Sequence, residues 1–338
     1  MLSAQLDDYE IAEVIGAGTV GTIFAATHRV TGESVAIKKL HPGVSQDPLI
    51  RARFKRETVV MERLRHPNIV RSMGGGEHEG QLFYVMERLD GGTVKDLLQT
   101  SNAIQWPIVV EIGRQICSAL QFAHNHGVIH RDLKPSNLFL TRDAEVKLGD
   151  FGIARDLHSS DITSSGMTVG THAYMAPEQI TGDANVSGKA DLYSLGCCLF
   201  EMLIGRTPFH GAHFAELFEQ HLKKTAPRVK ELVPGCPEPL DNIIAKLLEK
   251  SAEERPFNAR QVQAVMLKLD ESIQNPDEGT PQEGDISAAE TAHRGHLLLQ
   301  QEIEQQFGNQ PREIGWKKIA VILLALATLI GATIVLGL

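Results

Sequence analysis

The stretch from His130 to Asn137 gathers the side chains best suited to chemistry, and Asp150-Phe151-Gly152 follows it. Asp132 could accept a proton from a hydroxyl group, and Lys134, two residues later, could contact a transferring phosphate. Asn137 and Asp150 offer oxygen ligands of the hard type that Mg²⁺ prefers. The two motifs occur in this order and with this separation, which chance does not explain. Together they indicate phosphoryl transfer to a hydroxyl group.

Gly16-Ala17-Gly18-Thr19-Val20-Gly21 is a glycine-rich stretch between two strand-like runs, residues 9–15 and 22–27. Glycines there let backbone amides approach phosphate oxygens without an intervening Cβ atom. A Rossmann fingerprint would need a helix after the glycines, whereas the run that follows is typical of a strand. The stretch is therefore a candidate phosphate-covering loop, with a plain hairpin turn as the alternative.

Val35-Ala36-Ile37-Lys38 predicts a strand in which Ala36 and Lys38 share one face. A small residue beside a cation suits a site that admits a flat base and holds phosphates. The alternative is a surface lysine at the end of a strand.

Asp47-Pro48 predicts the start of a helix, with an N-cap aspartate and a first-turn proline. Glu57 then lies within an otherwise apolar stripe, which consists of Ile50, Phe54, Met61 and Leu64. A carboxylate turned toward a core needs a partner, and Lys38 is the candidate. Glu62 is an alternative on spacing alone but lies off the stripe, and a solvated Glu57 is a further alternative.

These residues must be positioned by elements that the sequence divides into two groups. Residues from about 9 to 89 predict short strands with one main helix, and residues from about 90 to 269 predict mainly helices, so the fold class is α+β. Residues 270–316 form a polar, turn-rich linker in which residues 287–307 could form a short helix.

The composition fits a folded, soluble enzyme: 42% of the residues are hydrophobic, 22% are charged, and the net charge is −9. That acidic balance argues against a nucleic-acid binder, which needs a basic face. The cysteines predict buried free thiols, and the clustered histidines have no partners that would complete a zinc site. These cysteines are Cys117, Cys197, Cys198 and Cys236.

Residues 319–338 form an uncharged, apolar run of twenty, long enough as a helix to cross a hydrocarbon core of about 30 Å. Lys317 and Lys318 precede this run directly, whereas the first residues of the chain show no secretory signal. The positive-inside tendency keeps everything before the run cytoplasmic. The sequence therefore predicts a single-pass anchor in the cell membrane, with a buried core helix as the alternative.

The region from about Tyr9 to Leu269 resembles the eukaryotic-type protein kinase family, and within it the bacterial membrane-anchored serine/threonine kinases. Besides the motifs above, Gly170-Thr171, Ala176-Pro177-Glu178 and Asp191 to Gly196 match segments of that family. The resemblance implies a bilobal fold, with a small lobe at about 9–89 and a large lobe at about 90–269. It also implies that Arg255 pairs with Glu178.

The resemblance further implies which residues bind Mg·ATP, with Mn²⁺ as an alternative metal. Lys38 would contact the α- and β-phosphates and pair with Glu57, while Thr171 would brace Asp132 and Lys134. The nucleotide would be enclosed by the glycine-rich loop, its flanking strands and the Met86–Leu89 hinge. The implied ATP-binding residues are Ile15, Gly16, Ala17, Gly18, Thr19, Val20, Gly21, Ile23, Ala36, Lys38, Met86, Glu87, Leu89 and Phe139.

Protein serine and threonine side chains are the implied substrates, because Lys134-Pro135-Ser136 resembles the serine/threonine branch of the family. Related kinases directed by arginine carry acidic residues where this chain has Thr93 and Ser136, so a strong preference for arginine is not expected. By the same resemblance, Ile153 favours threonine over serine as the acceptor.

The segment 159–171 contains seven hydroxyl residues, which is also typical of a flexible polar loop. A phosphate there could order the segment against Arg131 and Arg155. By resemblance to related kinases, Thr163, Ser165 and Thr168 are the candidate autophosphorylation sites.

The resemblance leaves two rival functions to weigh. A pseudokinase usually lacks Lys38, Asp132 or Asp150, all of which are present here. A small-molecule kinase would not need the Gly-Thr and Ala-Pro-Glu segment, which forms a protein-substrate platform in the family. A homodimer formed through the kinase lobes is a further expectation.

Overall fold

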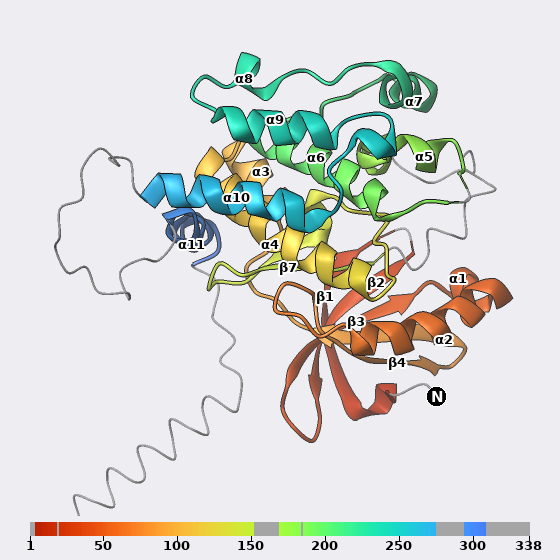
Figure 1. Cartoon of the computed structure of the whole chain (residues 1–338). Coiled ribbons are helices and arrows are strands. Elements are labelled where there is room, and N and C mark those ends of the chain that lie inside the picture. The colour runs from red at the N-terminus through yellow and green to blue at the C-terminus, as the bar shows by residue number, and fades with distance from the viewer. Residues whose placement is uncertain (1–3, 19, 152–168, 184, 275–293, 309–338) are drawn as a thin grey trace, which may run out of the picture. The chain divides into compact units, whose positions relative to one another are not determined.

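The computed structural model describes residues 4–18, 20–151, 169–183, 185–274 and 294–308, which form two compact units (Figure 1). The first unit holds the residues before Arg63 together with Ser72–Asp90. The second holds Arg63–Arg71 and the described residues from Gly91 onward. The division into a strand-rich first part and a helical second part confirms the predicted α+β class.

The first unit is a five-stranded antiparallel sheet with helices beside it. The strand order is β1-β2-β3-β5-β4, so each hairpin partner in the sequence is also a neighbour in space. Its elements are η1 (Leu6–Asp8), β1 (Tyr9–Ala17), β2 (Gly21–His28), β3 (Ser34–Leu40), α1 (Pro42–Gln46), α2 (Pro48–Arg63), β4 (Ser72–His78) and β5 (Gln81–Glu87). The short helix α1 was not predicted by the sequence pattern.

Helix α2 begins where the sequence predicts, because Asp47 Oδ1 accepts hydrogen bonds from the amides of Leu49 and Ile50 at 2.7 and 3.2 Å. Phe54 of α2 is fully buried, and its ring lies 4.3 Å from the ring of Tyr84 in β5. Tyr84 is paired with Lys38 of β3, so α2 packs on the sheet face that carries Lys38.

The second unit is mainly helical and also contains the two-stranded sheet β6-β7. Helix α6 is almost entirely buried, which explains its continuous run of apolar residues. The elements are α3 (Val94–Ser101), α4 (Trp106–Asn125), η2 (Pro135–Asn137), β6 (Leu138–Leu140), β7 (Val146–Leu148), η4 (Val169–Tyr174), α5 (Pro177–Ile180), α6 (Gly188–Ile204), α7 (Phe214–Lys223), α8 (Val229–Leu232), α9 (Glu238–Leu247), η5 (Ala252–Glu254), α10 (Ala259–Gln274) and α11 (Arg294–Phe307).

Three predictions about the remaining sequence have different outcomes. Cys117, Cys197 and Cys198 are buried free thiols as predicted, whereas Cys236 is only half-buried. Residues 287–307 contain helix α11, within the predicted linker. None of the described helices combines the length and the apolar character needed to cross a bilayer, and residues 319–338 lie outside the described part of the chain.

Candidate active site

The short sheet β6-β7 brings the two predicted metal ligands into one place. Leu138 pairs with Leu148, so the residue before β6 and the residues after β7 lie at the same end of the sheet. The Gly149 amide donates a hydrogen bond to the carbonyl oxygen of Asn137 at 3.0 Å. Because Asp150 follows directly, Asn137 and Asp150 belong to one local site.

Asp132 lies beside Asn137 and is held by two neighbours. The ammonium group of Lys134 is 2.9 Å from Asp132 Oδ2. Asn137 Nδ2 donates to the backbone oxygen of Asp132 at 2.8 Å and lies 3.4 Å from Asp132 Oδ2. The side chain of Asp132 keeps 18% of its surface exposed, so a substrate hydroxyl could reach the carboxylate.

The backbone leading into Asp132 is anchored on the carboxylate of Asp191, at the start of the buried helix α6. Asp191 Oδ2 accepts from the amide of His130, and Oδ1 accepts from the amide of Arg131, both at 2.8 Å. His124 Nε2 lies 2.8 Å from the same Oδ2 atom. Asp191 therefore fixes two consecutive amides immediately before the candidate base.

His130 ties the two chemical motifs together. Its Nδ1 atom accepts from the Asp132 amide at 3.2 Å, so Nε2 carries the proton that is donated to the Gly149 carbonyl oxygen at 2.9 Å. Its ring lies 4.7 Å from the ring of Phe151. Phe151 is buried, and the residue preceding it, Asp150, is thereby positioned from both sides.

Arg131 and Asp150 both adopt a left-handed backbone conformation, with φ angles of +64° and +51°. Residues other than glycine rarely adopt this conformation, which costs about 1–3 kcal/mol and persists only where the surroundings impose it. At Arg131, the backbone amide of the strained residue is held by the Asp191 carboxylate. Arg131 directly precedes the candidate base Asp132, and Asp150 is itself a candidate metal ligand.

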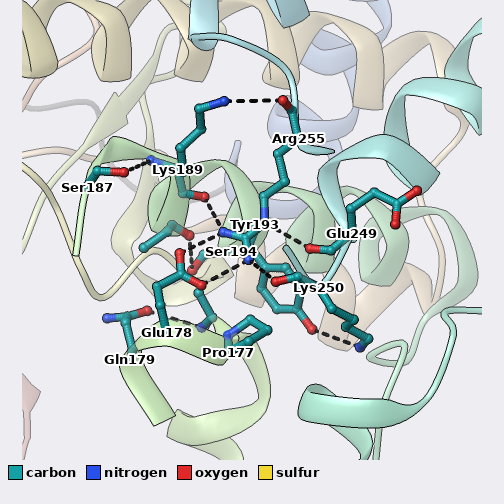
Figure 2. Close-up of polar contacts among 12 residues, drawn as sticks. Pro177, Glu178, Gln179, Ser187, Lys189, Tyr193, Ser194, Glu249, Lys250 and Arg255 are labelled. Carbon is teal, nitrogen blue, oxygen red and sulfur yellow. Dashed lines mark hydrogen bonds and ion pairs between the residues drawn. The ribbon is translucent and has the colours of Figure 1, made fainter. Parts of the chain in front are cut away.

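Figure 2 shows the predicted pair of Glu178 and Arg255, which the structure confirms. The two guanidinium nitrogens Nη1 and Nη2 donate to the two carboxylate oxygens at 2.7 and 2.9 Å. Glu178 lies in α5, and the next residue, Gln179, donates through Nε2 to the Arg131 carbonyl oxygen at 3.0 Å. The pair thus supports a helix that also holds the backbone directly before Asp132.

The first unit places the glycine-rich stretch between β1 and β2, as a strand–turn–strand element. The Gly18 amide donates to the Gly21 carbonyl oxygen at 3.0 Å, which closes the turn. A Cβ atom on Gly21 would collide with the Lys39 carbonyl oxygen, so only glycine fits there. The result confirms the predicted strand after the glycines and excludes the Rossmann alternative.

Within the same sheet, the strand register groups several of the predicted ATP-binding residues. Ile23 of β2 is directly opposite Lys38 of β3, and Ala36 of β3 is directly opposite Met86 of β5. Residues opposite one another share a face, so a cation, a small residue and two apolar side chains lie on one side of the sheet. Glu87 is the last residue of β5, and Leu89 lies two residues further along the chain.

Several predicted residues lie outside the described part of the chain or have side chains outside it. Thr19, Gly152, Thr163, Ser165 and Thr168 belong to the first group. The side chains of Glu57 and Thr171 belong to the second, so the predicted pairing of Glu57 with Lys38 and the bracing role of Thr171 stay predictions.

A divalent metal ion fits the donors at Asn137 and Asp150. The Nδ2 group of Asn137 donates to Asp132, whereas Asn137 Oδ1 accepts no hydrogen bond from the described residues. An amide oxygen and a carboxylate that belong to one local site are hard ligands of the kind that Mg²⁺ accepts together with water and phosphate oxygens.

Comparison with known proteins agrees with this geometry. The family model described as a protein kinase domain matches residues 9–266. The chain belongs to the protein kinase family. Its kinase domain is 41% identical over 253 residues to the serine/threonine-protein kinase PknJ of Mycobacterium tuberculosis, an alignment that covers 73% of this chain and 43% of PknJ.

Two further relatives of the kinase domain are bacterial. The probable serine/threonine-protein kinase PknB of Lactococcus lactis is 36% identical over 250 residues, covering 74% of this chain and 40% of that protein. The crystal structure of the PknI kinase domain of Mycobacterium tuberculosis superposes with a TM-score of 0.62 at 28% identity, covering 78% of this chain and 97% of that structure. The chain spans less than half the length of the curated relatives it matches. The kinase domain is therefore of the bacterial serine/threonine type.

Two positioning residues of the kinase domain were missed by sequence reasoning. Asp191 was recognised only as part of a segment that matches the family, and Gln179 was not singled out. An aspartate inside an otherwise apolar helix was the available signal for Asp191, since a buried carboxylate needs donors. No pattern in the sequence points to Gln179, whose partner is a backbone carbonyl 48 residues away.

We expect Asp191→Asn to lower the free energy of unfolding by about 1–3 kcal/mol, because the amide replaces one acceptor oxygen by a donor that faces another donor. Burial alone would raise the pKa of Asp191. The His124 side chain and nearby amides lower it by more than burial raises it, so the pKa lies below its ordinary value. A lowered pKa contributes stability above the unfolded-state pKa, and this contribution is lost at lower pH.

Urea denaturation of both proteins between pH 3 and 7 checks this prediction. The stability difference between wild type and variant should be constant near neutrality and should shrink below about pH 4. A difference that grows as the pH falls would contradict the assigned role of Asp191.

Proposed function

We propose that the chain is an ATP- and Mg²⁺-dependent serine/threonine protein kinase, which transfers the γ-phosphoryl group of ATP to protein hydroxyl groups. The observation that carries this proposal is the local arrangement of Asp132, Lys134 and Asn137 beside Asp150. Phosphoryl transfer requires an oriented hydroxyl, neutralised phosphate charge and a held metal, and this arrangement offers a group for each.

In this proposal Asp132 orients the substrate hydroxyl and accepts its proton, while Lys134 stabilises the negative charge on the transferred phosphate. Asn137 and Asp150 would hold Mg²⁺, which neutralises phosphate charge when bound. Lys38 would contact the α- and β-phosphates beneath the glycine-rich loop, and Glu57 and Thr171 would support Lys38 and Asp132. The other residues of the first unit predicted to bind ATP would surround the nucleotide base.

The experiment that tests the activity uses the full chain with labelled ATP, Mg²⁺ and three peptides that differ only in a serine, threonine or tyrosine acceptor. We expect label on serine and threonine and none on tyrosine, with threonine labelled faster. An Asp132→Asn variant is the control. A wild-type chain that binds Mg·ATP but labels no peptide and not itself would contradict the proposal.

We further propose regulation by autophosphorylation at Thr163, Ser165 or Thr168. Phosphate groups there would add about −2 charge each, for which arginine side chains are the natural partners. Mass spectrometry of chain incubated with Mg·ATP should find phosphate within 159–171. Fully active protein without phosphate in this segment would exclude the regulation.

Membrane-associated signalling is the third part of the proposal, with residues 319–338 as the spanning helix and the kinase domain in the cytoplasm. Twenty consecutive uncharged residues after two lysines support it. The full chain should remain in the membrane pellet after alkaline carbonate extraction, and deletion of 319–338 should release it. We also propose that two copies associate through their kinase domains, which crosslinking in the membrane tests.

A further inference from the structure

Helix α11 lies beyond the region that matches the kinase family, which ends at residue 266, yet it packs on the second unit. It contacts α3, α4 and α10, and Figure 1 shows it in blue beside α4 and α10. Leu299 and Ile303, one turn apart, have no exposed surface. Leu297, on another side of the same helix, keeps 43% of its surface exposed. The helix therefore has a buried face and a solvated face.

The N-terminal end of α11 fits closely onto α4. A Cβ atom on Gly295 would lie 2.5 Å from the Pro107 carbonyl oxygen, so only glycine allows this approach. His296 Nδ1 is 3.3 Å from Glu111 Oε1. The Glu111 side chain is completely buried and also accepts two hydrogen bonds from Arg114. This end of α11 thus joins a buried polar network of α4.

The middle and the C-terminal end of α11 are held by α3 and its surroundings. Ser101 Oγ donates to Glu302 Oε1 at 2.6 Å, and Gln306 Nε2 donates to the Asp96 carbonyl oxygen at 2.8 Å. The carbonyl oxygen of Phe307 accepts from Arg142 Nη2 at 3.1 Å. Polar contacts along the whole helix, with a buried apolar pair between them, specify one register.

The Phe307 ring marks where the helix ends. It lies against Gly92, where φ is +68° and a Cβ atom would come within 2.5 Å of the ring. Gly92 directly precedes Thr93, which caps α3 through hydrogen bonds with Asp96. Helix α11 is therefore seated against the beginning of α3 as well as its end.

We propose that α11 is a clamp that fastens the segment before the membrane span to the kinase domain and so confines the domain to proteins held close to the bilayer. The proposal rests on the proposed anchor at residues 319–338. With α11 docked, residues 308–318 would join it to the span, and eleven residues reach at most about 40 Å even when fully extended. With α11 released, residues 275–318 would be free and could reach up to about 150 Å.

The first experiment measures docking directly, by amide hydrogen exchange on the full chain in nanodiscs. The variant Leu299→Asp/Ile303→Asp places two carboxylates in the buried face and should speed exchange in 296–307 at least about 100-fold. The control Leu297→Asp adds one carboxylate of the same kind on the solvated face and should exchange like wild type. Wild-type exchange as fast as in the double variant would overturn the clamp.

A milder pair of variants keeps the test decisive if the double variant does not fold. Ser101→Glu places a carboxylate opposite Glu302, whereas Ser101→Lys places a cation there. Like charges repel and opposite charges pair, so exchange in α11 should rise with glutamate and stay low with lysine. Equal exchange in the two variants would contradict the docking contact.

The second experiment measures reach, by energy transfer from a dye on the kinase domain to an acceptor lipid in vesicles. A cysteine introduced at the exposed Glu253, with Cys236→Ser, carries the dye, since the other cysteines are buried. Transfer should be high in wild type and Leu297→Asp and clearly lower in the double variant. Phosphorylation of a soluble peptide should be within about twofold in all three, because α11 touches no reacting group.

The outcomes separate the clamp from the function on which it rests. Unchanged transfer in a double variant that is inserted in the bilayer overturns the clamp alone. A wild-type chain that does not enter the vesicles overturns the anchor and the confinement together. A wild-type chain that does not phosphorylate the peptide would contradict the kinase activity. The hydrogen-exchange experiment would still test whether α11 is docked.

Discussion

Asp132→Asn is expected to lower the rate of phosphoryl transfer by about 10²–10⁴-fold while leaving the fold intact. Asparagine has nearly the same size, and the 2.8 Å bond from Asn137 goes to the backbone oxygen of residue 132, which the substitution keeps. The amide cannot accept the substrate's proton and no longer pairs with Lys134. Steady-state kinetics with Mg·ATP and a threonine peptide should show the loss in kcat, with little change in KM for ATP.

Asp143→Asn provides the matched control for Asp132→Asn. Asp143 is an exposed aspartate in the turn between β6 and β7, close in sequence to the site. The same chemical change there should alter kcat by less than about twofold. Thermal unfolding should give similar midpoints for all three proteins. An Asp132→Asn enzyme with wild-type turnover would remove Asp132 from the role of base.

The chemical core of the site was predictable because the residues that form it are close in sequence. Asp132, Lys134 and Asn137 lie within one loop, and a two-stranded pairing is enough to bring Asp150 to them. The helix that starts at Pro48 was predictable for the same reason, since its cap and its apolar spacing are local signals. Local patterns suffice where the interaction itself is local.

The supporting shell of the site was not predictable from such patterns. Asp191 binds amides about 60 residues away, and Gln179 binds a carbonyl oxygen 48 residues away. Backbone groups exist at every residue, so the sequence carries no mark of which ones will be partners. The pair of Glu178 and Arg255, separated by 77 residues, was predicted only through the family resemblance.

The docking of helix α11 was also not predictable from the sequence. The sequence predicted that residues 287–307 could form a short helix, and the structure shows why this segment has few regularly spaced apolar residues. Only Leu299, Ile303 and Gly295 are buried along it. Its polar side chains bind Ser101 and a backbone oxygen of α3, and its last carbonyl oxygen binds Arg142. A helix held largely by polar contacts leaves little hydrophobic pattern from which its docking could be inferred.

Arg255→Met is expected to lower the free energy of unfolding of the second unit by about 3–5 kcal/mol, the cost of breaking a buried ion pair by removing one partner. Arg255 has no exposed side-chain surface, and all five of its N–H groups donate hydrogen bonds. Two go to Glu178, and the others go to the carbonyl oxygens of Lys189, Glu249 and Lys250 at 2.8, 2.9 and 3.0 Å (Figure 2).

Lysine cannot fully replace Arg255, so the stability loss should differ in size between a lysine and a methionine variant. Arg255→Lys keeps the charge but offers at most three donors without the planar fork, so its loss should lie between wild type and methionine. The exposed neighbour Glu254→Gln should change stability by less than about 0.5 kcal/mol. Urea denaturation followed by the fluorescence of Trp106, in the same unit, measures all of them. A methionine variant as stable as wild type would contradict the argument.

The double variant Glu178→Gln/Arg255→Met separates the pair from the packing around it. Methionine alone leaves the Glu178 carboxylate without its cation, whereas glutamine beside methionine removes that charge. The double variant should therefore lose less stability than the sum of the single variants. Because Gln179 of the same short helix holds the Arg131 carbonyl oxygen, the single variant should also lower kcat. The double variant should recover part of that loss, since the coupling acts through the position of α5.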